Sequence, residues 1–300
     1  MHRACPRPLT ASTVLGWPLR RSYRHATAHV GDREVRWGER TLIMGVLNAT
    51  PDSFSGHGVL DRPDLAVELA TAMASVGADV VDVGGESTRP GAADVAPEEQ
   101  IRRVVPIVAG IAAAVSVPVS IDTSSALVAA AALDAGAVMV NDVRGLRAED
   151  LAALVAERDV PVVIMHNQRL QPSGDDVIGD VRQGFEAAID RATAAGIGTH
   201  RLIVDPGFGF GWSTGQNLEM LRRLPELWYL GLPLLVGTSR KSTIGAALAD
   251  PGGHPRPAAG RDWGTAATVA QAICAGVDVV RVHDVADMAD VVAVTDAIVR

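Results

Sequence analysis

The sequence is poor in cysteine and has no long apolar run. Only two cysteines, Cys5 and Cys274, occur among 300 residues. Two cysteines cannot build a disulfide framework, and this pair lacks the close spacing of metal ligands, so we expect a reducing compartment, the cytoplasm. No segment approaches the roughly 20 consecutive apolar residues of a transmembrane helix, so we expect no contact with a membrane.

An excess of positive charge is also missing. Lys and Arg number 27 against 35 Asp and Glu, which gives a formal net charge of -8. Proteins that bind nucleic acid usually carry a basic excess, so this class is disfavoured. An anionic small substrate stays compatible, since it needs only a local group of cations. Aromatic residues make up 4% and hydrophobic residues 48%, as suits a core of small aliphatic side chains.

The first 28 residues differ in composition from the remainder. They contain five arginines and no acidic residue, and they lack the apolar centre of a secretory signal. We expect a disordered tail over 1–28, or a start codon placed upstream of the true one, with a transit peptide as the alternative. A single domain is expected over 29–300, because no composition break suggests a second one.

Short runs rich in Val and Ile alternate with amphipathic stretches from Leu42 onward. Unbroken apolar runs are typical of parallel strands that are buried on both faces. The expected strands span 42–48, 79–85, 118–123, 139–142, 162–166, 202–207, 234–239 and 279–284. The expected helices span 64–76, 97–115, 124–135, 148–157, 177–195, 216–224, 241–249 with 264–275, and 286–299.

Strict alternation of eight strands with helices predicts an α/β fold, a single (β/α)₈ TIM barrel. Three strings, SVGADVVDV, DAGAVMVNDV and CAGVDVVRV, repeat one order of helix end, Gly turn and strand. The segment before Leu42 is expected to form a small hairpin that closes the bottom of the barrel. The stretch 250–257 is expected to be a surface insertion.

Polar residues stand where most of these strands end. The active site of such a barrel lies at the C-terminal strand ends, so a ring of polar ends predicts a polar pocket. Each of Asp82, Asn141 and His166 taken alone fits a structural role equally well. Unpaired buried polar groups are costly, which favours function for the whole set. The set is Asn48, Asp82, Asp122, Asn141, His166, Asp205, Lys241, Arg281 and His283.

These residue types suit two kinds of ligand group. Carboxylates and amides at Asp122, Asn141 and Asp205 can accept the adjacent N–H donors of a flat heterocycle. The cations Arg89, Lys241 and Arg281, with His283, suit a pyrophosphate. Asn48 and the loop that follows it can help to hold Mg²⁺, which prefers oxygen ligands and bridges phosphate oxygens.

Seven segments, taken in order, resemble the dihydropteroate synthase family along nearly the whole chain after about residue 35. They are MGVLNATPDSFS (44–55), DVGGESTRPGA (82–92), SIDT (120–123), VNDV (140–143), DPGFGFG (205–211), GTSRKSTIG (237–245) and RVHDV (281–285). The resemblance implies a transferase of folate biosynthesis, a homodimer, that joins p-aminobenzoate to a dihydropterin pyrophosphate.

The resemblance also implies a role for each matching residue. Asn48 resembles the Mg²⁺ ligand. The residues that resemble the pterin pocket are Asp122, Asn141, Asp205 and Lys241, with Arg240 covering the pterin face. Arg281 and His283, helped by Asn48 and Arg89, resemble the pyrophosphate pocket. The residues that resemble the p-aminobenzoate site are Thr88, Arg89, Pro90 and Ser242, with Phe54 and Phe210 as aromatic walls. Of these, Asp122, Lys241, Arg281 and His283 are the expected catalytic residues.

The sequence departs from the family pattern at several loops. Trp212, Gln216 and Thr243 replace residues that are common there, as do MHNQ (165–168) and SFSGHG (53–58). These changes leave the amine acceptor open.

Three other functions are therefore kept as alternatives. One is a metal-dependent hydrolase with His166, His283, Asp205 and Asp122 as ligands. A second is a pterin barrel that transfers methyl groups to a corrinoid protein. The third is a divergent paralogue that uses another amine or binds pterin without catalysis.

The expected reaction is a substitution at the carbon that carries pyrophosphate. Because the electron-rich dihydropterin delocalises a cation at that carbon, we expect pyrophosphate to leave first, in an SN1-like step. Mg²⁺, Arg89, Arg281 and His283 would stabilise the leaving group. An arylamine is neutral at pH 7, so no strong base is needed before it attacks.

Overall fold

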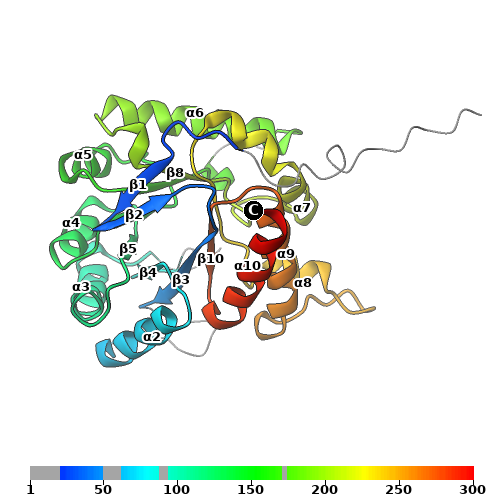
Figure 1. Cartoon of the computed structure of the whole chain (residues 1–300), viewed down its shortest axis with the longest axis horizontal. Helices are drawn as coiled ribbons and strands as arrows, with labels where there is room; N and C mark the ends of the chain where they lie inside the picture. Colours follow the sequence, from blue (N-terminus) through cyan, green and yellow to red (C-terminus); the bar gives the residue numbers. More distant parts are fainter. Residues whose placement is uncertain (1–20, 50–61, 88–93, 171–173) are drawn as a thin grey trace, which may run out of the picture.

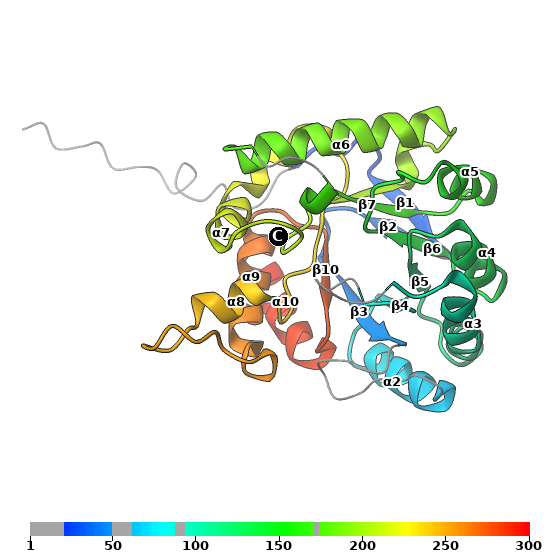
Figure 2. The same cartoon turned by 180° about the vertical axis from the view of Figure 1, so that it is seen from behind.

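A computed structural model describes residues 21–49, 62–87, 94–170 and 174–300. In this part of the chain, eight parallel strands surround a central axis and helices cover them outside (Figures 1 and 2). The strands are β3 (Leu42–Asn48), β4 (Val80–Gly84), β5 (Val119–Asp122), β6 (Met139–Asp142), β7 (Val162–Met165), β8 (Leu202–Asp205), β9 (Leu235–Val236) and β10 (Val279–Val282). The helices are α2 (Pro63–Ser75), α3 (Pro97–Ala114), α4 (Ala126–Asp134), α5 (Glu149–Arg158), α6 (Val177–Ala194), α7 (Thr214–Arg223), α8 (Ser242–Ala247), α9 (Asp262–Cys274) and α10 (Val285–Val299).

The sheet closes into a barrel, which confirms the predicted fold class. Hydrogen-bonded neighbours run in the order β8-β7-β6-β5-β4-β3-β10-β9. A parallel bridge between Val204 and Leu234 then joins the two ends of that order. The last strand of the chain thus pairs with the first strand of the barrel, Val279 opposite Leu42. All eight C-terminal strand ends consequently meet at one mouth.

The seventh barrel strand is much shorter than the sequence predicts. A strand was expected over 234–239, but β9 holds only Leu235 and Val236. The chain turns immediately afterwards, because the amide of Lys241 donates to the carbonyl of Thr238 and Arg240 takes a left-handed φ of 57°. This early turn places Lys241 at the start of α8, directly at the mouth of the barrel.

A hairpin closes the bottom of the barrel, as predicted. Strands β1 (Thr27–Val30) and β2 (Arg33–Arg36) pair antiparallel across a two-residue turn. Val30 and Trp37 pack against the apolar side chains that open the barrel strands, among them Met44 and Met139. A separate and larger core fills the space between the strands and the surrounding helices. The apolar plug leaves only the opposite end of the barrel open to a ligand.

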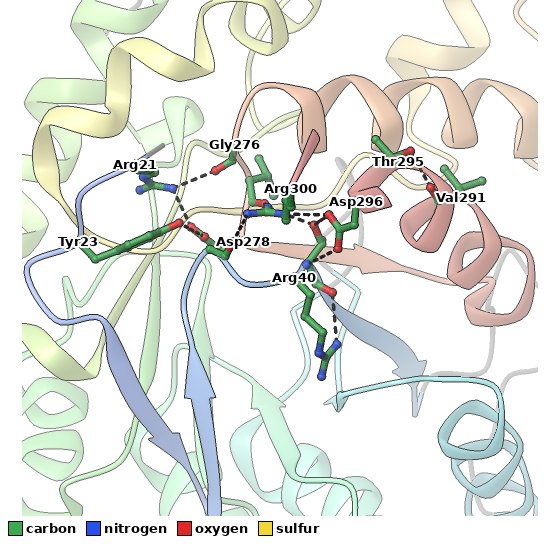
Figure 3. A network of polar contacts seen from close by, with 12 residues as sticks. Arg21, Tyr23, Arg40, Gly276, Asp278, Val291, Thr295, Asp296 and Arg300 are labelled. Carbon is green, nitrogen blue, oxygen red and sulfur yellow. Dashed lines mark hydrogen bonds and ion pairs between the residues drawn. The ribbon is translucent and has the colours of Figure 1, made fainter. Parts of the chain in front are cut away.

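A polar network at the bottom of the barrel shows that the N-terminal tail ends earlier than predicted. The tail was expected over 1–28, but Arg21 and Tyr23 both donate to the fully buried carboxylate of Asp278, at 2.7 and 2.6 Å. Figure 3 shows this network continuing through Arg300 to Asp296 on α10. A buried carboxylate needs partners, and the segment 21–28 supplies two of them, so it belongs to the folded domain. Residues 1–20 lie outside the described part.

No helix in the described ranges is long and apolar enough to cross a membrane.

Candidate active site

Four neighbouring strands place their C-terminal ends in one row. The register sets Asn48 of β3 opposite Gly84 of β4, Gly84 opposite Asp122 of β5, and Asp122 opposite Asn141 of β6. Gly84 leaves a gap in this row, because a Cβ there would lie 3.8 Å from Asn48 Oδ1 and 3.9 Å from Asp122 Oδ2. Two oxygen acceptors therefore face the same small space at the mouth, as a ligand with several donors requires.

Arg281 reaches across the mouth from β10 to this row. Its Nη2 donates to Asp122 Oδ2 at 2.7 Å, and its Nε donates to Asp82 Oδ2 at 2.7 Å. The same oxygen of Asp82 accepts the amide Nδ2 of Asn141 at 3.0 Å. Asp82, which belongs to the predicted ring of polar strand ends but received no role toward a substrate, thus holds two predicted site residues, Arg281 and Asn141.

Burial changes the acidity of the groups in this cluster. Burial raises the pKa of Asp122 to about 7, and the charge of Asp82 adds to the effect while Arg281 opposes it. Burial lowers the pKa of Arg281, but the carboxylates of Asp82 and Asp122 raise it by more, so the guanidinium stays charged. Asp122 consequently titrates close to neutral pH, which is common for functional carboxylates.

Asp205 and Lys241 form the opposite wall of the mouth. Burial raises the pKa of Asp205, opposed by the charge of Lys241, and Asp205 Oδ1 accepts the amide of Gly207 at 2.8 Å. Burial lowers the pKa of Lys241 to about 8. The charges of Arg281 and Asp122 also act on Lys241, so the two walls share one electrostatic environment. The sequence prediction that these four residues converge is confirmed.

The loop after β8 presents an aromatic ring to two cations. Lys241 Nζ lies 4.7 Å from the ring centre of Phe210, and the guanidinium carbon of Arg169 lies 4.8 Å from it. Lys241 also donates to the carbonyl of Phe208. Phe210 is only 9% exposed, so the cations hold a largely buried ring. This arrangement gives the mouth a rigid apolar edge beside Lys241.

Other predicted residues take defined positions near the mouth. His283 Nδ1 lies 3.0 Å from Ser239 Oγ, and the amide of His283 donates to the same hydroxyl at 3.2 Å. Ser242 is exposed at the first position of α8. The guanidinium of Arg240 pairs with Asp262 at 3.0 Å. The roles of these three residues toward substrates stay predictions.

Several predicted site residues lie outside the described part of the chain. They are Phe54 of the first loop and the three residues of the second loop, Thr88, Arg89 and Pro90. Asn48 is described, but the remainder of its predicted metal loop is not.

The departures from the family pattern have structural partners beside the mouth. The ring of Trp212 stacks on His166 with centroids 5.5 Å apart. His166 Nε2 lies 2.7 Å from Gln168 Oε1, and burial lowers the pKa of this histidine. Gln216 exchanges hydrogen bonds with Ser213 in a capping box that starts α7. Two of the departures, Gln168 and Trp212, thus pack around one buried histidine.

Two residues at the mouth, Asp82 and Arg169, had no predicted role toward a substrate. Asp82 was noted as a polar strand end, and its position inside the apolar run DVVDVGG was the available signal. Arg169 carried no signal, because only the fold brings its loop over Phe210.

No group of three or more His, Cys, Asp and Glu residues in the described ranges is arranged to hold a metal ion. His166 instead contacts Gln168 and Trp212. The ligand set of the alternative hydrolase therefore does not assemble among these residues.

Comparison with known proteins defines the class of this barrel. The model of the pterin binding enzyme family matches residues 44–283, from the first barrel strand to the last. The protein is a pterin-binding TIM-barrel enzyme.

Individual relatives narrow the class. A dihydropteroate synthase of Synechocystis is 45% identical over 278 residues, covering 90% of this chain and 94% of the relative. A Clostridium difficile dihydropteroate synthase solved with pteroic acid has a TM-score of 0.82 and 44% identity over 88% of this chain and 98% of its own. A Xanthomonas albilineans dihydropteroate synthase solved with 4-aminobenzoic acid has a TM-score of 0.82 and 40% identity over 91% and 98%. This chain belongs to the dihydropteroate synthase family.

Proposed function

We propose that this enzyme condenses 6-hydroxymethyl-7,8-dihydropterin pyrophosphate with p-aminobenzoate, giving 7,8-dihydropteroate and pyrophosphate. The observation that carries the proposal is the convergence of Asp122, Asn141 and Asp205 with Arg281 and Lys241 at one barrel mouth. Paired acceptors beside fixed cations suit a pterin ring that carries a pyrophosphate. The relatives solved with pteroic acid and 4-aminobenzoic acid support the same substrates.

The residues of the mouth have different roles in the reaction. The bond between the methylene carbon and the pyrophosphate oxygen breaks first, and the electron pair leaves with pyrophosphate. Arg281 and His283 stabilise that developing negative charge. Asp122 and Asp205 favour the cation that is left on the ring. The neutral amine of p-aminobenzoate then forms the new C–N bond and loses one proton to solvent, so the enzyme needs no strong base.

Mg²⁺ fits this site as a partner of the pyrophosphate. Asn48 would hold it through Oδ1, which faces the gap at Gly84. A single amide oxygen suits Mg²⁺, because this ion usually keeps several waters and takes further ligands from phosphate oxygens. When bound, Mg²⁺ supplies positive charge to the leaving group.

We also propose a cytoplasmic homodimer. Trp263 at the start of α9 is 89% exposed, and Val294 and Ile298 are exposed one turn apart on α10. Helices α9 and α10 pack against each other, so these side chains come from neighbouring elements, and a gathering of exposed apolar groups supports a contact with a second copy. Cys274 is a free thiol, which supports a reducing compartment.

One assay tests the proposed reaction. Purified protein is incubated with the dihydropterin pyrophosphate, Mg²⁺ and p-aminobenzoate, and the product is identified by mass. A product with the mass of dihydropteroate is expected. Release of pyrophosphate without that product would favour a paralogue that uses another amine. Pterin binding without release would indicate a non-catalytic subunit and would contradict the proposal.

A further inference from the structure

In the described ranges, three aspartates in or directly beside barrel strands are fully buried, and only two of them have hydrogen-bond donors at both carboxylate oxygens. Asp142 accepts from Ser124 and the amide of Arg144 at Oδ1 and from the amide of Leu146 at Oδ2. Asp278 accepts from Tyr23 at one oxygen and from Arg21 and the amide of Leu234 at the other.

Asp82 differs, because its Oδ1 is buried and has no hydrogen-bond partner in the part of the chain that the structure describes. Leaving a buried carboxylate oxygen without a donor costs stability. Asp82 is therefore poorly suited to a purely structural role. The contacts of its other oxygen, Oδ2, are the reason for a buried carboxylate at this position.

That other oxygen holds two residues of the pterin and pyrophosphate site. Asp82 Oδ2 accepts Nε of Arg281 at 2.7 Å and Nδ2 of Asn141 at 3.0 Å. Because the side-chain Nδ2 of Asn141 donates to Asp82, the side-chain Oδ1 of Asn141 points away from Asp82 and is available to accept a hydrogen bond. Because Arg281 is held through Nε, its orientation is set before any ligand arrives.

The two carboxylates that pair with Arg281 differ in access. The side chain of Asp82 has no exposed surface, whereas that of Asp122 is 12% exposed. A ligand that donates to Asp122 competes with Arg281 Nη2 for the same carboxylate. It cannot reach Asp82, so the bond from Nε persists and keeps the guanidinium in place while Nη2 is released.

We propose that Asp82 is a positioning residue: it anchors Arg281 through Nε and orients Asn141. Asp122 can then exchange Arg281 Nη2 for the pterin, while the guanidinium, still held at Nε, offers the released Nη2 to the pyrophosphate. This inference rests on the proposed function, because it assumes that Arg281 meets a pyrophosphate.

The test compares Asp82→Asn with a matched control, Asp142→Asn. Both variants neutralise a fully buried aspartate on a barrel strand, but the side chain of Asp142 bonds to Ser124 and to the amides of Arg144 and Leu146, and no hydrogen bond joins it to Arg281 or Asn141 in the described structure. We expect Asp82→Asn to raise the Kd of inorganic pyrophosphate, measured by calorimetry with Mg²⁺, about tenfold. Asp142→Asn should change that Kd less than twofold, even if its Tm falls.

A double-mutant cycle on kcat/KM for the dihydropterin pyrophosphate shows whether Asp82 acts through Arg281. Asp82→Asn should lower kcat/KM about thirtyfold in the wild-type background and by less than about threefold in an Arg281→Ala background. An equal loss in both backgrounds would mean a structural effect only and would overturn the inference, as would wild-type values for Asp82→Asn. Wild-type protein without product would instead overturn the proposed function.

If Asp82→Asn does not fold, Arg281→Lys tests the same anchor from the other side. An ammonium group cannot hold two carboxylates through two nitrogens in a fixed geometry, so pyrophosphate affinity should again fall about tenfold. Unchanged affinity would refute the anchor.

Discussion

Replacing Asp122 by Asn tests the chemistry of the mouth most directly. The carboxylate is expected to accept two adjacent N–H donors of the pterin, and an amide of the same size retains only one acceptor. Hydrogen bonds to a charged group contribute roughly 1.5–3 kcal/mol each. A loss of about 3 kcal/mol corresponds to a decrease in kcat/KM of roughly 150-fold, since each 1.36 kcal/mol is a factor of ten.

The fold should tolerate this change. Asp122 lies near the buried carboxylate of Asp82, and Arg281 keeps Asp82 as its partner when Asp122 is neutral. Removing one buried charge from a group of two acids and one base leaves a balanced pair, so Tm should stay within a few degrees of the wild-type value. A loss of activity can therefore be separated from a loss of structure.

The assay follows pyrophosphate release from the dihydropterin substrate in a single turnover, with and without p-aminobenzoate. If departure of pyrophosphate comes first, Asp122→Asn should slow its release to a similar extent in both conditions. Release at the wild-type rate by a folded variant would remove Asp122 from the mechanism and refute the electrostatic argument.

Three further results are expected. The profile of kcat/KM against pH should be bell-shaped: it rises through about 7 as Asp122 loses its proton and falls above about 8 as Lys241 loses its charge; a flat profile between pH 6 and 9 would contradict these roles. Tyr23→Phe should lower the free energy of unfolding in urea by about 1.5–2.5 kcal/mol, because Asp278 loses a donor at 2.6 Å. It should leave kcat/KM unchanged, since that network lies at the closed end of the barrel; an equal drop in activity would show that the two ends are coupled. Chelation with EDTA should lower activity at least tenfold and Mg²⁺ should restore it, whereas restoration by Zn²⁺ alone would point to a different site.

The sequence alone determined the fold class and predicted the strand ends at which most residues of the proposed site lie. Unbroken apolar runs separated by amphipathic stretches specify buried parallel strands, because each run must be covered on both faces. The order of these runs along the chain then places Asn48, Asp122, Asn141 and Asp205 at strand ends, and a closed barrel has only one mouth for them. Residue type added the chemistry, since carboxylates and amides accept donors and cations bind phosphate.

Only the tertiary structure decided the contacts between residues that lie far apart in the sequence. The pairing of Arg281 with Asp82 and Asp122 joins strands β10, β4 and β5, and the register that permits it arises only when the barrel closes. The folded state of residues 21–28 likewise depends on Asp278, more than 250 positions away in the chain. Local sequence propensity cannot predict these contacts, because the energy of each contact depends on the burial of a charged residue that is distant in the chain.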